Sequence, residues 1–396
     1  MKIKKDYDIC IIGGLGHVGL PLGILFASKG LQVCLNDINE EVAKTVLRGD
    51  LPFVEYGAEP LLKETVANGN LTVSLNPECI SNAKYVIITI GTPVDEYLNP
   101  KTRQFLKSIE NIKQYLNPAQ VIIVRSSVYP RTCKQIINLL GSDKEWQLAY
   151  CPERIVQGYA VLELEKLPQI VAGFSDHAIE EASSLFEKIS SKIIRTTMGE
   201  AEMVKLFSNS WRYIQFALAN QFYMIANDFG EDYDRIREIM IDGYDRVKGL
   251  PSAGFASGPC LLKDTMQLSA FYDNRFLLGQ AAMNVNEGLP NYIVNNLKKE
   301  LDLAQKTVGI LGMAFKADVD DIRDSLSYKL GKILRFEGAN VLYSDEFAQN
   351  PDFITKEELI ESSDIIIIGC PHSSYKGLII PDDAMVLDLR GIIQYS

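Results

Sequence analysis

One cysteine in this sequence stands where a sulfur nucleophile is expected. Cys260 follows a stretch rich in glycine, serine and proline between residues 249 and 259, and a helix is predicted to begin beside it. A helix N-terminus favours the thiolate, which is the reactive form of cysteine. Asp264 is four residues further on, on the same face of this helix, where its carboxylate can position a water molecule near the sulfur.

Two further clusters carry groups that can move protons or stabilise negative charge. Lys205 and Asn209 are four residues apart on a long predicted helix, which Glu202 shares, so Lys205 and Asn209 can point into one cleft. A partly desolvated lysine can stabilise an alkoxide or take a proton, and an asparagine can hold a water molecule or a carbonyl oxygen. Glu153 lies just beyond the end of the strand predicted at 147–150 and is a candidate general base. The alternatives are a solvated helix face for the first cluster and a solvated loop carboxylate for Glu153.

A dinucleotide-binding loop is predicted near the N-terminus, where the sequence GLGHVG occupies residues 14–19. Its first glycine permits a tight turn, its second lets a pyrophosphate approach the backbone, and its third allows close helix–strand packing. The next predicted strand ends at Asp37, whose carboxylate can bind a ribose 2′-hydroxyl and would repel a 2′-phosphate, so NAD is favoured over NADP. The loop residues assigned to the cofactor are Gly14, Gly16, His17, Val18 and Gly19. The glycines after residue 308 are too widely spaced for this turn, so the C-terminal region is better suited to a different nucleotide.

The elements that must position these residues alternate between short β-branched runs and amphipathic stretches, which predicts an α/β fold with mostly parallel sheets. Strands are expected at residues 7–12, 31–36, 71–74, 85–90, 121–124, 147–150, 169–172 and 192–195, and again at 307–311, 340–344, 365–369 and 385–389. Between the two sets, a long helix over residues 200–227 shows a periodic apolar stripe, interpreted as buried in the core or at a dimer interface. We therefore expect a Rossmann-type domain at residues 1–198, a central helix with a helical middle domain at 199–300, and a Rossmann-like α/β domain at 301–396.

Composition excludes several classes of protein. The net charge of −11 argues against nucleic acid and anionic membranes as partners, and no apolar run is long enough to span a bilayer. The apolar stretch after the N-terminal lysines is interrupted by glycines, so we interpret it as a strand and a helix of a cytoplasmic protein. With no Cys-x-x-Cys pair and three histidines, no metal site is expected. The remaining cysteines are interpreted as core residues: Cys10, Cys34, Cys79, Cys133, Cys151 and Cys370.

Taken together, these motifs resemble the UDP-glucose and UDP-N-acetylhexosamine 6-dehydrogenase family across essentially the whole chain. The Pro-Glu pair at 152–153, the K-x-x-x-N helix at 205–209 and the C-x-x-K-D sequence at 260–264 carry the resemblance. Further similar segments are GTP at 91–93, SSVYP at 126–130 and GMAFK at 312–316, which is followed by Asp321, Arg323 and Ser325.

The resemblance implies that a UDP-linked sugar is oxidised at C6 to a carboxylate in two NAD-dependent steps, through a thiohemiacetal and a thioester on Cys260. By the same resemblance, Lys205 and Asn209 stabilise the oxyanion, Asp264 activates water, Glu153 transfers protons, and Ser127 belongs to the catalytic set. The cofactor set gains Gly91, Thr92, Pro93, Ser127, Lys263 and Arg323. The substrate set comprises Glu153, Arg154, Lys205, Asn209, Arg246, Phe255, Gly258, Phe315 and Lys316. Arg246 stands where the family places an arginine that reaches the neighbouring subunit's sugar, so a homodimer or a higher homo-oligomer is expected.

The motifs indicate the identity of the UDP-linked sugar less clearly than the class of reaction. Gln157 replaces a glutamate typical of the UDP-glucose enzymes, and residues 152–158 and 209–212 resemble the N-acetylhexosamine branch. Residues 260–264 resemble the UDP-glucose branch, and Pro259 stands where the other branch often has histidine. The balance leans slightly to UDP-N-acetylmannosamine or UDP-N-acetylglucosamine, with UDP-glucose as the alternative. A simple β-hydroxyacid or phosphogluconate-type dehydrogenase, or a non-catalytic NAD- or UDP-sugar-binding protein, are the other hypotheses.

Overall fold

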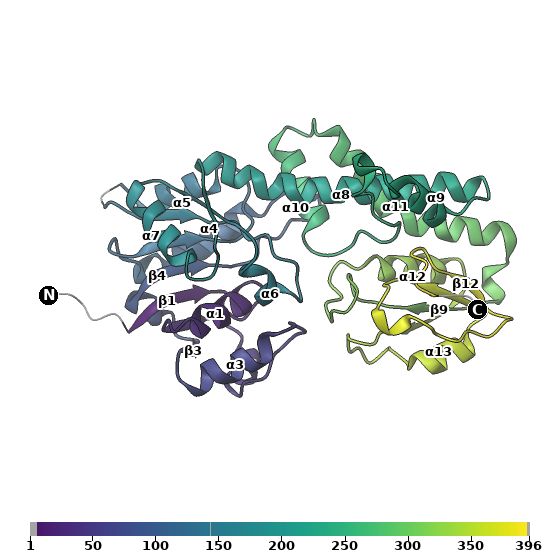
Figure 1. Cartoon of the computed structure of the whole chain (residues 1–396), viewed down its shortest axis with the longest axis horizontal. Coiled ribbons are helices and arrows are strands. Elements are labelled where there is room, and N and C mark those ends of the chain that lie inside the picture. The colour runs from purple at the N-terminus through teal and green to yellow at the C-terminus, as the bar shows by residue number, and fades with distance from the viewer. Residues whose placement is uncertain (1–5, 143, 394–396) are drawn as a thin grey trace. The chain divides into compact units, whose positions relative to one another are not determined.

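The computed structural model describes residues 6–142 and 144–393 and divides the chain into two compact units, Met1–Phe207 and Ser208–Ser396 (Figure 1). The division falls within the longest helix, α8 (Met198–Asp228). Within the described residues, no helix is both long enough and apolar enough to cross a membrane.

The first unit alternates strands and helices along almost its whole length. Its elements are β1 (Tyr7–Ile12), α1 (Gly19–Ser28), β2 (Val33–Asn36), α2 (Glu40–Leu47), α3 (Ala58–Ala67), β3 (Leu71–Ser74), η1 (Pro77–Asn82), β4 (Ala83–Ile88), α4 (Thr102–Ile112), η2 (Lys113–Tyr115), β5 (Val121–Val124), α5 (Thr132–Leu140), β6 (Gln147–Tyr150), α6 (Ala160–Leu164), β7 (Gln169–Gly173), α7 (Asp176–Phe186) and β8 (Ile193–Arg195).

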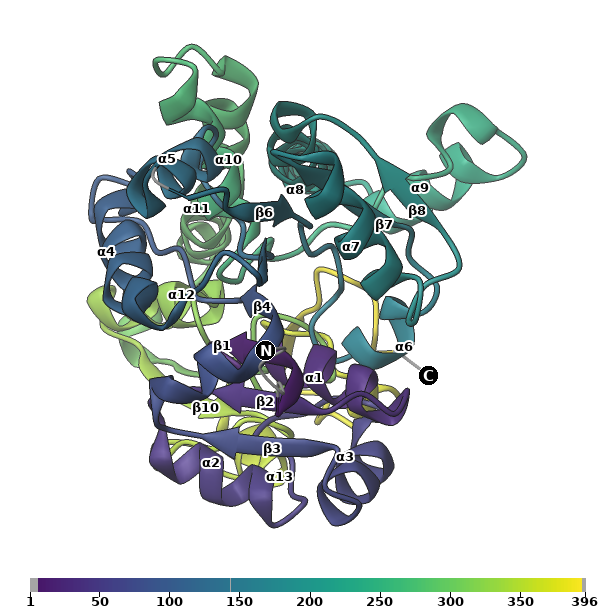
Figure 2. The same cartoon turned by 90° about the vertical axis from the view of Figure 1, so that its left-hand side faces the viewer.

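The strands form one eight-stranded sheet in the order β3-β2-β1-β4-β5-β6-β7-β8, in which only the β6–β7 pair is antiparallel. Successive side chains of a strand point to opposite faces, so β1 sends Ile9 and Ile11 to one core and Cys10 and Ile12 to the other. Helices α1, α3, α6 and α7 cover the first face, and α4, α5 and η1 cover the second (Figure 2). The expected mostly parallel sheet, covered on both faces, is confirmed.

The second unit has a helical part followed by a smaller sheet. After the C-terminal part of α8 come α9 (Tyr233–Ile241), η3 (Asp245–Val247), α10 (Leu261–Phe271), α11 (Leu277–Glu300), η4 (Leu303–Gln305), β9 (Thr307–Leu311), α12 (Leu326–Phe336), β10 (Asn340–Ser344), α13 (Lys356–Ser362), β11 (Ile365–Ile368), η5 (Ser373–Tyr375) and β12 (Met385–Leu387). The four strands are parallel in the order β10-β9-β11-β12. One face packs on α11 and α12 and the other on α13.

The apolar stripe of α8 is only partly covered within the single chain. It was interpreted as buried in the core or at a dimer interface, and the core interpretation fails for Trp211, which is 62% exposed, and for Leu218, which is 46% exposed. Phe207 is also exposed, and Ile225 extends the exposed set one further repeat of seven residues along the helix. The buried face of α8 includes Leu206 and Tyr213 together with smaller and polar residues such as Ala219 and Asn220. A periodic stripe identifies an apolar face, but not whether the same chain covers it.

A buried acid–histidine pair fixes the first loop of the smaller sheet. Asp345 follows β10, and its carboxylate accepts hydrogen bonds from the backbone N–H groups of Met313 and Ala314 at 2.6 and 2.9 Å. His372, fully buried, lies with Nε2 3.0 Å from the same carboxylate. Because the Asp318 N–H donates to His372 Nδ1, Nε2 must carry the proton that points at Asp345. Burial opposes ionisation of Asp345, but the hydrogen bonds from His372 and from backbone N–H groups outweigh it and lower its pKa to about 2.

We expect Asp345→Asn to lower the free energy of unfolding of this unit by roughly 3 kcal/mol at pH 7, because charge-assisted hydrogen bonds are lost inside the protein. The pKa of Asp345 is depressed, so its contribution is complete above its ordinary value of 3.8 and disappears as pH falls toward 2. Urea unfolding of the variant and the wild type should therefore converge between pH 4 and pH 2. Asp383→Asn, at an exposed carboxylate of the same unit, is the control and should change little at any pH. A constant difference down to pH 2 would contradict this role.

Candidate active site

The glycine loop between β1 and α1 has the close packing that a dinucleotide cradle requires. A Cβ atom at Gly19 would lie 2.5 Å from the Gly13 carbonyl oxygen, and one at Gly14 would lie 2.8 Å from the Leu35 Cβ. Gly16 has only the Gly13 oxygen nearby, at 3.6 Å, so its backbone stays open to an approaching ligand. The positive φ of the turn, 76°, falls on Gly13, one residue before the GxGxxG sequence. A side chain at Gly14 or Gly19 would fill this cradle, so the loop fits a pyrophosphate.

The acidic residue expected at the ribose lies beside this loop. Asp37 directly follows β2, and its Oδ2 accepts the N–H of Leu15 at 3.1 Å. Val18 is the N-cap of α1, which places the loop at a helix N-terminus. His17 packs on Phe53 with ring centroids 4.0 Å apart, and its Nδ1 lies 3.1 Å from the Gln157 amide nitrogen.

The other expected cofactor residues of the first unit lie at the same edge of the sheet. Gly91, Thr92 and Pro93 come after β4, and Ser127 comes after β5, the neighbouring strand. The Thr92 hydroxyl donates to the Ser127 carbonyl oxygen at 2.5 Å, so the two loops are in contact. Because β1, β4 and β5 are parallel neighbours, their carboxyl ends and the glycine loop share one edge, where α/β sheets bind nucleotides.

Glu153 is held by a buried arginine that the sequence analysis did not single out. Arg125 follows β5, is 1% exposed, and donates from Nε to Glu153 Oε2 at 2.8 Å, with Nη2 forming an ion pair to the same oxygen. The second oxygen of Glu153 accepts the N–H groups of Arg154 and Ile155 at 2.7 and 3.1 Å. The Arg154 side chain itself donates to the Pro168 carbonyl. Four donors therefore occupy the carboxylate of Glu153, which ties the segment after β6 to the sheet.

The two ionisable residues expected on the first part of α8 have different surroundings. The carboxylate of Glu202 accepts the N–H groups of Arg131 and Cys133 at 2.7 and 3.1 Å, so it caps the N-terminus of α5. Lys205 is only 9% exposed, and within the described residues its ammonium forms no hydrogen bond or ion pair. A buried ammonium without a counter-charge is costly.

In the second unit, Cys260 is exposed at the N-cap of α10, and a carboxylate network lies on the first turn of the same helix. Asp264 is fully buried. Its Oδ1 accepts the Lys263 ammonium and its Oδ2 accepts the Asn209 amide, both at 2.6 Å. The predicted helix start at Cys260 is thus confirmed, and Asn209, Lys263 and Asp264 are brought together.

The segment after β9 packs against the loop that carries Cys260. A Cβ atom at Gly258 would lie 2.5 Å from the ring of Phe315, and the Ser257 hydroxyl accepts the Leu326 N–H at 3.0 Å. Arg323 forms a bidentate ion pair with Asp321, with Nε 2.9 Å from Oδ1 and Nη2 2.6 Å from Oδ2. This ion pair raises the pKa of the Arg323 guanidinium, and the nearby sulfur of Cys260 adds to the effect. The positive charge of Arg323 therefore favours the thiolate of Cys260.

The remaining expected substrate residues occupy different settings. Phe255 is buried in the core beside the smaller sheet, and Lys316 is half-buried directly after Phe315. Arg246 is exposed in η3, with its guanidinium 5.8 Å from the ring centre of Tyr244.

One charged residue of the second unit was missed by the sequence analysis. Arg390 lies beside the backbone of Gly254 and 5.9 Å from the ring centre of Phe216. Burial lowers the pKa of its guanidinium, and no ion pair or side-chain hydrogen bond of Arg390 is formed within residues 6–142 and 144–393. A possible signal was its place just after the last predicted strand, where ligand-binding residues collect.

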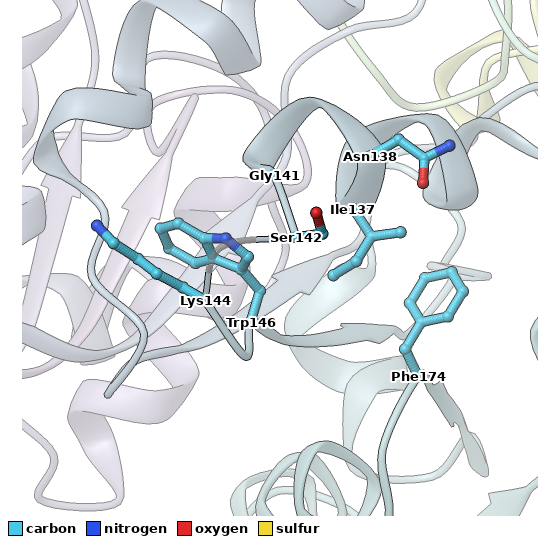
Figure 3. Close-up of a pocket in the computed structure, with 7 residues that line it drawn as sticks. All are labelled: Ile137, Asn138, Gly141, Ser142, Lys144, Trp146 and Phe174. Carbon is cyan, nitrogen blue, oxygen red and sulfur yellow. The ribbon is translucent and has the colours of Figure 1, made fainter.

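A surface pocket of about 310 Å³ in the first unit is separate from these residues (Figure 3). It is lined by Ile137, Asn138, Gly141, Ser142, Lys144, Trp146 and Phe174. Trp146 directly precedes β6, so the pocket lies at the amino end of that strand, whereas the glycine loop lies at the carboxyl edge. None of the expected site residues lines it.

Comparison with known proteins bears on all parts of the chain. The NAD binding domain of the UDP-glucose/GDP-mannose dehydrogenase family matches residues 7–190, the central domain 199–288 and the UDP binding domain 309–395. A UDP-N-acetyl-D-mannosamine dehydrogenase of Methanocaldococcus jannaschii is 33% identical over 386 residues, covering 95% of this chain and 88% of that protein.

Solved structures give the same fold. The UDP-D-ManNAc dehydrogenase of Pyrococcus horikoshii has a TM-score of 0.89 at 28% identity, covering 98% of this chain and 96% of that one. A UDP-glucose dehydrogenase of Pyrobaculum islandicum also reaches 0.89, at 23% identity, over 99% and 96% of the two chains, and is similar in fold alone. The resemblance drawn from the motifs and the expected NAD-binding domain are confirmed, and the chain belongs to the UDP-glucose/GDP-mannose dehydrogenase family.

Proposed function

We propose that this enzyme oxidises the C6 hydroxyl of a UDP-linked N-acetylhexosamine to a carboxylate, with UDP-N-acetylmannosamine as the first candidate. The observation that carries the proposal is the exposed Cys260 at the N-terminus of α10, next to Arg323 and one helical turn before the buried Asp264. A simple alcohol dehydrogenation does not need a nucleophilic thiol, whereas oxidation to an acid benefits from covalent capture of the aldehyde.

The chemistry assigned to Cys260 proceeds in four steps. Loss of a hydride from C6 and of the hydroxyl proton gives the aldehyde, to which the Cys260 thiolate adds to form a thiohemiacetal. Loss of a second hydride and a proton gives a thioester, and water then releases the carboxylate and restores the thiol. NAD bound at the glycine loop supplies the hydride acceptor, and one sugar consumes two molecules of it. Gly14, Gly16, Gly19 and Asp37 would hold it.

The geometry supports distinct tasks for the neighbouring side chains. We assign Asp264 to orienting the water that attacks the thioester, because Lys263 and Asn209 hold both of its oxygens in place. Lys205, whose buried ammonium lacks a partner among the described residues, is assigned to stabilising the oxyanion. For Glu153, the four donors on its carboxylate favour positioning of its segment over the proton transfer expected from the sequence. The roles of Ser127, Arg154, Arg246 and Lys316 stay predictions.

The choice of sugar rests on relatives and on a short segment. The Methanocaldococcus jannaschii protein and the Pyrococcus horikoshii structure are both named as UDP-N-acetylmannosamine dehydrogenases. Residues 152–158, with Gln157 in place of a second acid, point the same way. We also propose that the three domains expected at 1–198, 199–300 and 301–396 provide the NAD, central and UDP-sugar parts of the enzyme.

The yield of NADH tests the reaction and the sugar together. With limiting UDP-N-acetylmannosamine, we expect two NADH per sugar, and with UDP-glucose or UDP-N-acetylglucosamine a much slower reaction. Cys260→Ser should reduce acid formation by at least about 1000-fold, because the covalent intermediate is lost. Cys370→Ser, at a buried cysteine of the same unit, is the matched control. One NADH per sugar, or an unaffected Cys260→Ser variant, would reject the four-electron mechanism.

A second prediction concerns the UDP group. We propose that Arg390 binds the diphosphate, because its buried guanidinium forms no ion pair or side-chain hydrogen bond among the described residues and lies in the part matched by the UDP binding domain. Arg390→Met should weaken binding of UDP by about 10- to 100-fold, as expected for loss of a charge-assisted hydrogen bond. Isothermal titration with UDP alone measures this effect. Arg335→Met, at an exposed arginine on α12, should leave binding unchanged, and equal affinities of all three proteins would refute the assignment.

The exposed stripe of α8 supports a homodimer. Trp211, Leu218 and Ile225 recur every seven residues and so share one side of the helix, and each is exposed in the single chain. An apolar stripe of this kind is typical of a surface that another protein covers. We propose that a second copy of this chain covers it.

The variant carrying Trp211→Glu and Leu218→Glu should be monomeric, because two carboxylates would have to be buried without partners in the dimer. Light scattering coupled to size exclusion should give about twice the chain mass of 44.2 kDa for the wild type and the single mass for the variant. Lys332→Glu, an exposed change on α12, is the charge control. A monomeric wild type at assay concentration would disprove the dimer.

A further inference from the structure

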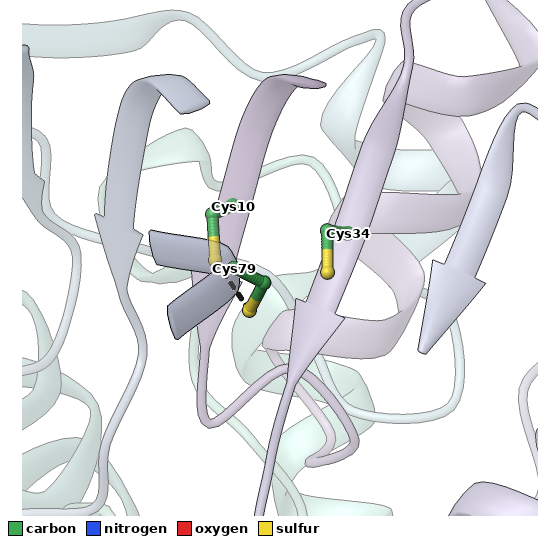
Figure 4. A group of neighbouring side chains, drawn as sticks. All are labelled: Cys10, Cys34 and Cys79. Atoms are coloured by element: carbon green, nitrogen blue, oxygen red, sulfur yellow. Dashed lines mark hydrogen bonds between the residues drawn. The ribbon is translucent and has the colours of Figure 1, made fainter. Parts of the chain in front are cut away.

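Three cysteines from distant parts of the first unit meet on one face of its sheet. Cys10 lies on β1 and Cys34 on β2, and the two are direct neighbours in the parallel register, so their side chains point to the same face. Cys79 approaches them from η1 (Figure 4). The sulfurs of Cys10 and Cys79 are 3.9 Å apart, and all three sulfurs lie within 4.8 Å of one another. We call these residues the cysteine triad.

The triad is enclosed in the apolar core that η1, α4 and α5 cover. Cys10 and Cys34 are 0% exposed and Cys79 is 9% exposed. No histidine, aspartate or glutamate of the described residues joins the three sulfurs. The hydroxyls of Thr72 and Ser74 reach Cys34 and Cys79, so polar groups stand behind two of the thiols.

The thiols influence one another's ionisation. Hydrogen bonds to its two neighbours, together with burial, raise the pKa of Cys10. Hydrogen bonding with its two neighbours instead lowers the pKa of Cys79.

The spacing of the sulfurs matches that of a three-coordinate metal site. An ion at about 2.3 Å from three sulfurs in a plane separates them by about 4.0 Å. The observed Cys10–Cys79 separation of 3.9 Å needs almost no adjustment, and the 4.8 Å limit on the others allows closure by rotation of side chains. Structural zinc sites take four ligands, and the triad offers three. Soft thiolates without a fourth ligand suit Cu(I) instead.

We propose that Cys10, Cys34 and Cys79 form a trigonal thiolate site for one Cu(I) ion. The ion replaces the thiol protons, which pass to solvent, and copper remains in the +1 state, so no electron is transferred. The bound ion would tie β1, β2 and η1 together. Cys10 is three residues before Gly13 and Cys34 is three residues before Asp37, so the tied strands are those that carry the NAD loop and its acidic residue.

Competition with bicinchoninate under anaerobic, reducing conditions tests the proposal, with Cu(I) alone as the probe. The wild type should withdraw one Cu(I) per chain. Changes in residues that only support metal ligands typically weaken metal binding by about 10- to 100-fold. Cys34→Ser and Cys79→Ser each remove a ligand, so each should weaken Cu(I) binding by more than this. Cys133→Ser, at a buried thiol on α5 outside the triad, should bind as the wild type does. X-ray absorption of the loaded wild type should count three sulfurs at about 2.3 Å.

The exposed thiol of Cys260 is the competing site, so Cys260→Ala is measured in parallel. Retention of the ion by Cys260→Ala supports the triad, whereas its loss would place the ion at Cys260 and overturn the proposal. The proposal would also be overturned if Cys34→Ser bound Cu(I) with full affinity, or if the wild type withdrew no Cu(I) from bicinchoninate. If the serine variants do not fold, the sulfur count of the wild type decides, and two sulfurs or fewer reject the site.

Discussion

Parallel strands form both sheets of this enzyme, apart from the β6–β7 pair, and the expected site residues that follow strands take their positions from that geometry. In a parallel sheet all strands end at one edge, so loops that are far apart in sequence become neighbours there. The glycine loop, residues 91–93, Ser127 and Glu153 all follow strands of the first sheet. In the second sheet, the segment after β9, Asp345 after β10 and His372 after β11 meet in the same way. The single antiparallel pair is β6–β7. Strand β6 runs parallel to β5, so Glu153, which follows β6, still lies at this edge.

Buried charges divide the polar residues of the enzyme into two groups. Arg125 with Glu153, Asp345 with His372, and Asp264 with Lys263 are paired within their own unit, and the first two pairs fix the loops on which they lie. A buried charge of this kind is expensive unless its partner is already in place, so these pairs define one conformation of each loop. Lys205 and Arg390 lack such partners among the described residues. Their charges are the ones left for anionic groups of a ligand, which is why they carry the proposals on oxyanion and diphosphate binding.

Large apolar residues and cysteines are usual core residues, but some of them have other settings in this protein. Several apolar residues of α8 are exposed, and three core cysteines form a cluster. On α8 several large apolar residues are exposed, whereas Tyr213 and the small and amide side chains Ala219 and Asn220 are buried. The Asn220 amide donates to the Asn286 amide oxygen at 2.9 Å, which helps to fix α8 against α11. In the triad, three residues that are ordinary core cysteines one by one become a possible ligand set, because adjacent strands place them in register.

The sequence by itself determined the order and type of the elements. Apolar alternation located the strands, and the glycine spacing with Asp37 predicted an NAD loop, because these signals are local in the chain. Cys260 as the N-cap of α10 was predictable for the same reason. Tertiary structure alone decided which charges are paired, since Arg125 and Glu153, or Asn209 and Asp264, are separated by 28 and 55 residues. It also decided that the stripe of α8 is exposed and that Cys10, Cys34 and Cys79 meet, because contact between distant residues depends on how the elements pack and not on their periodicity.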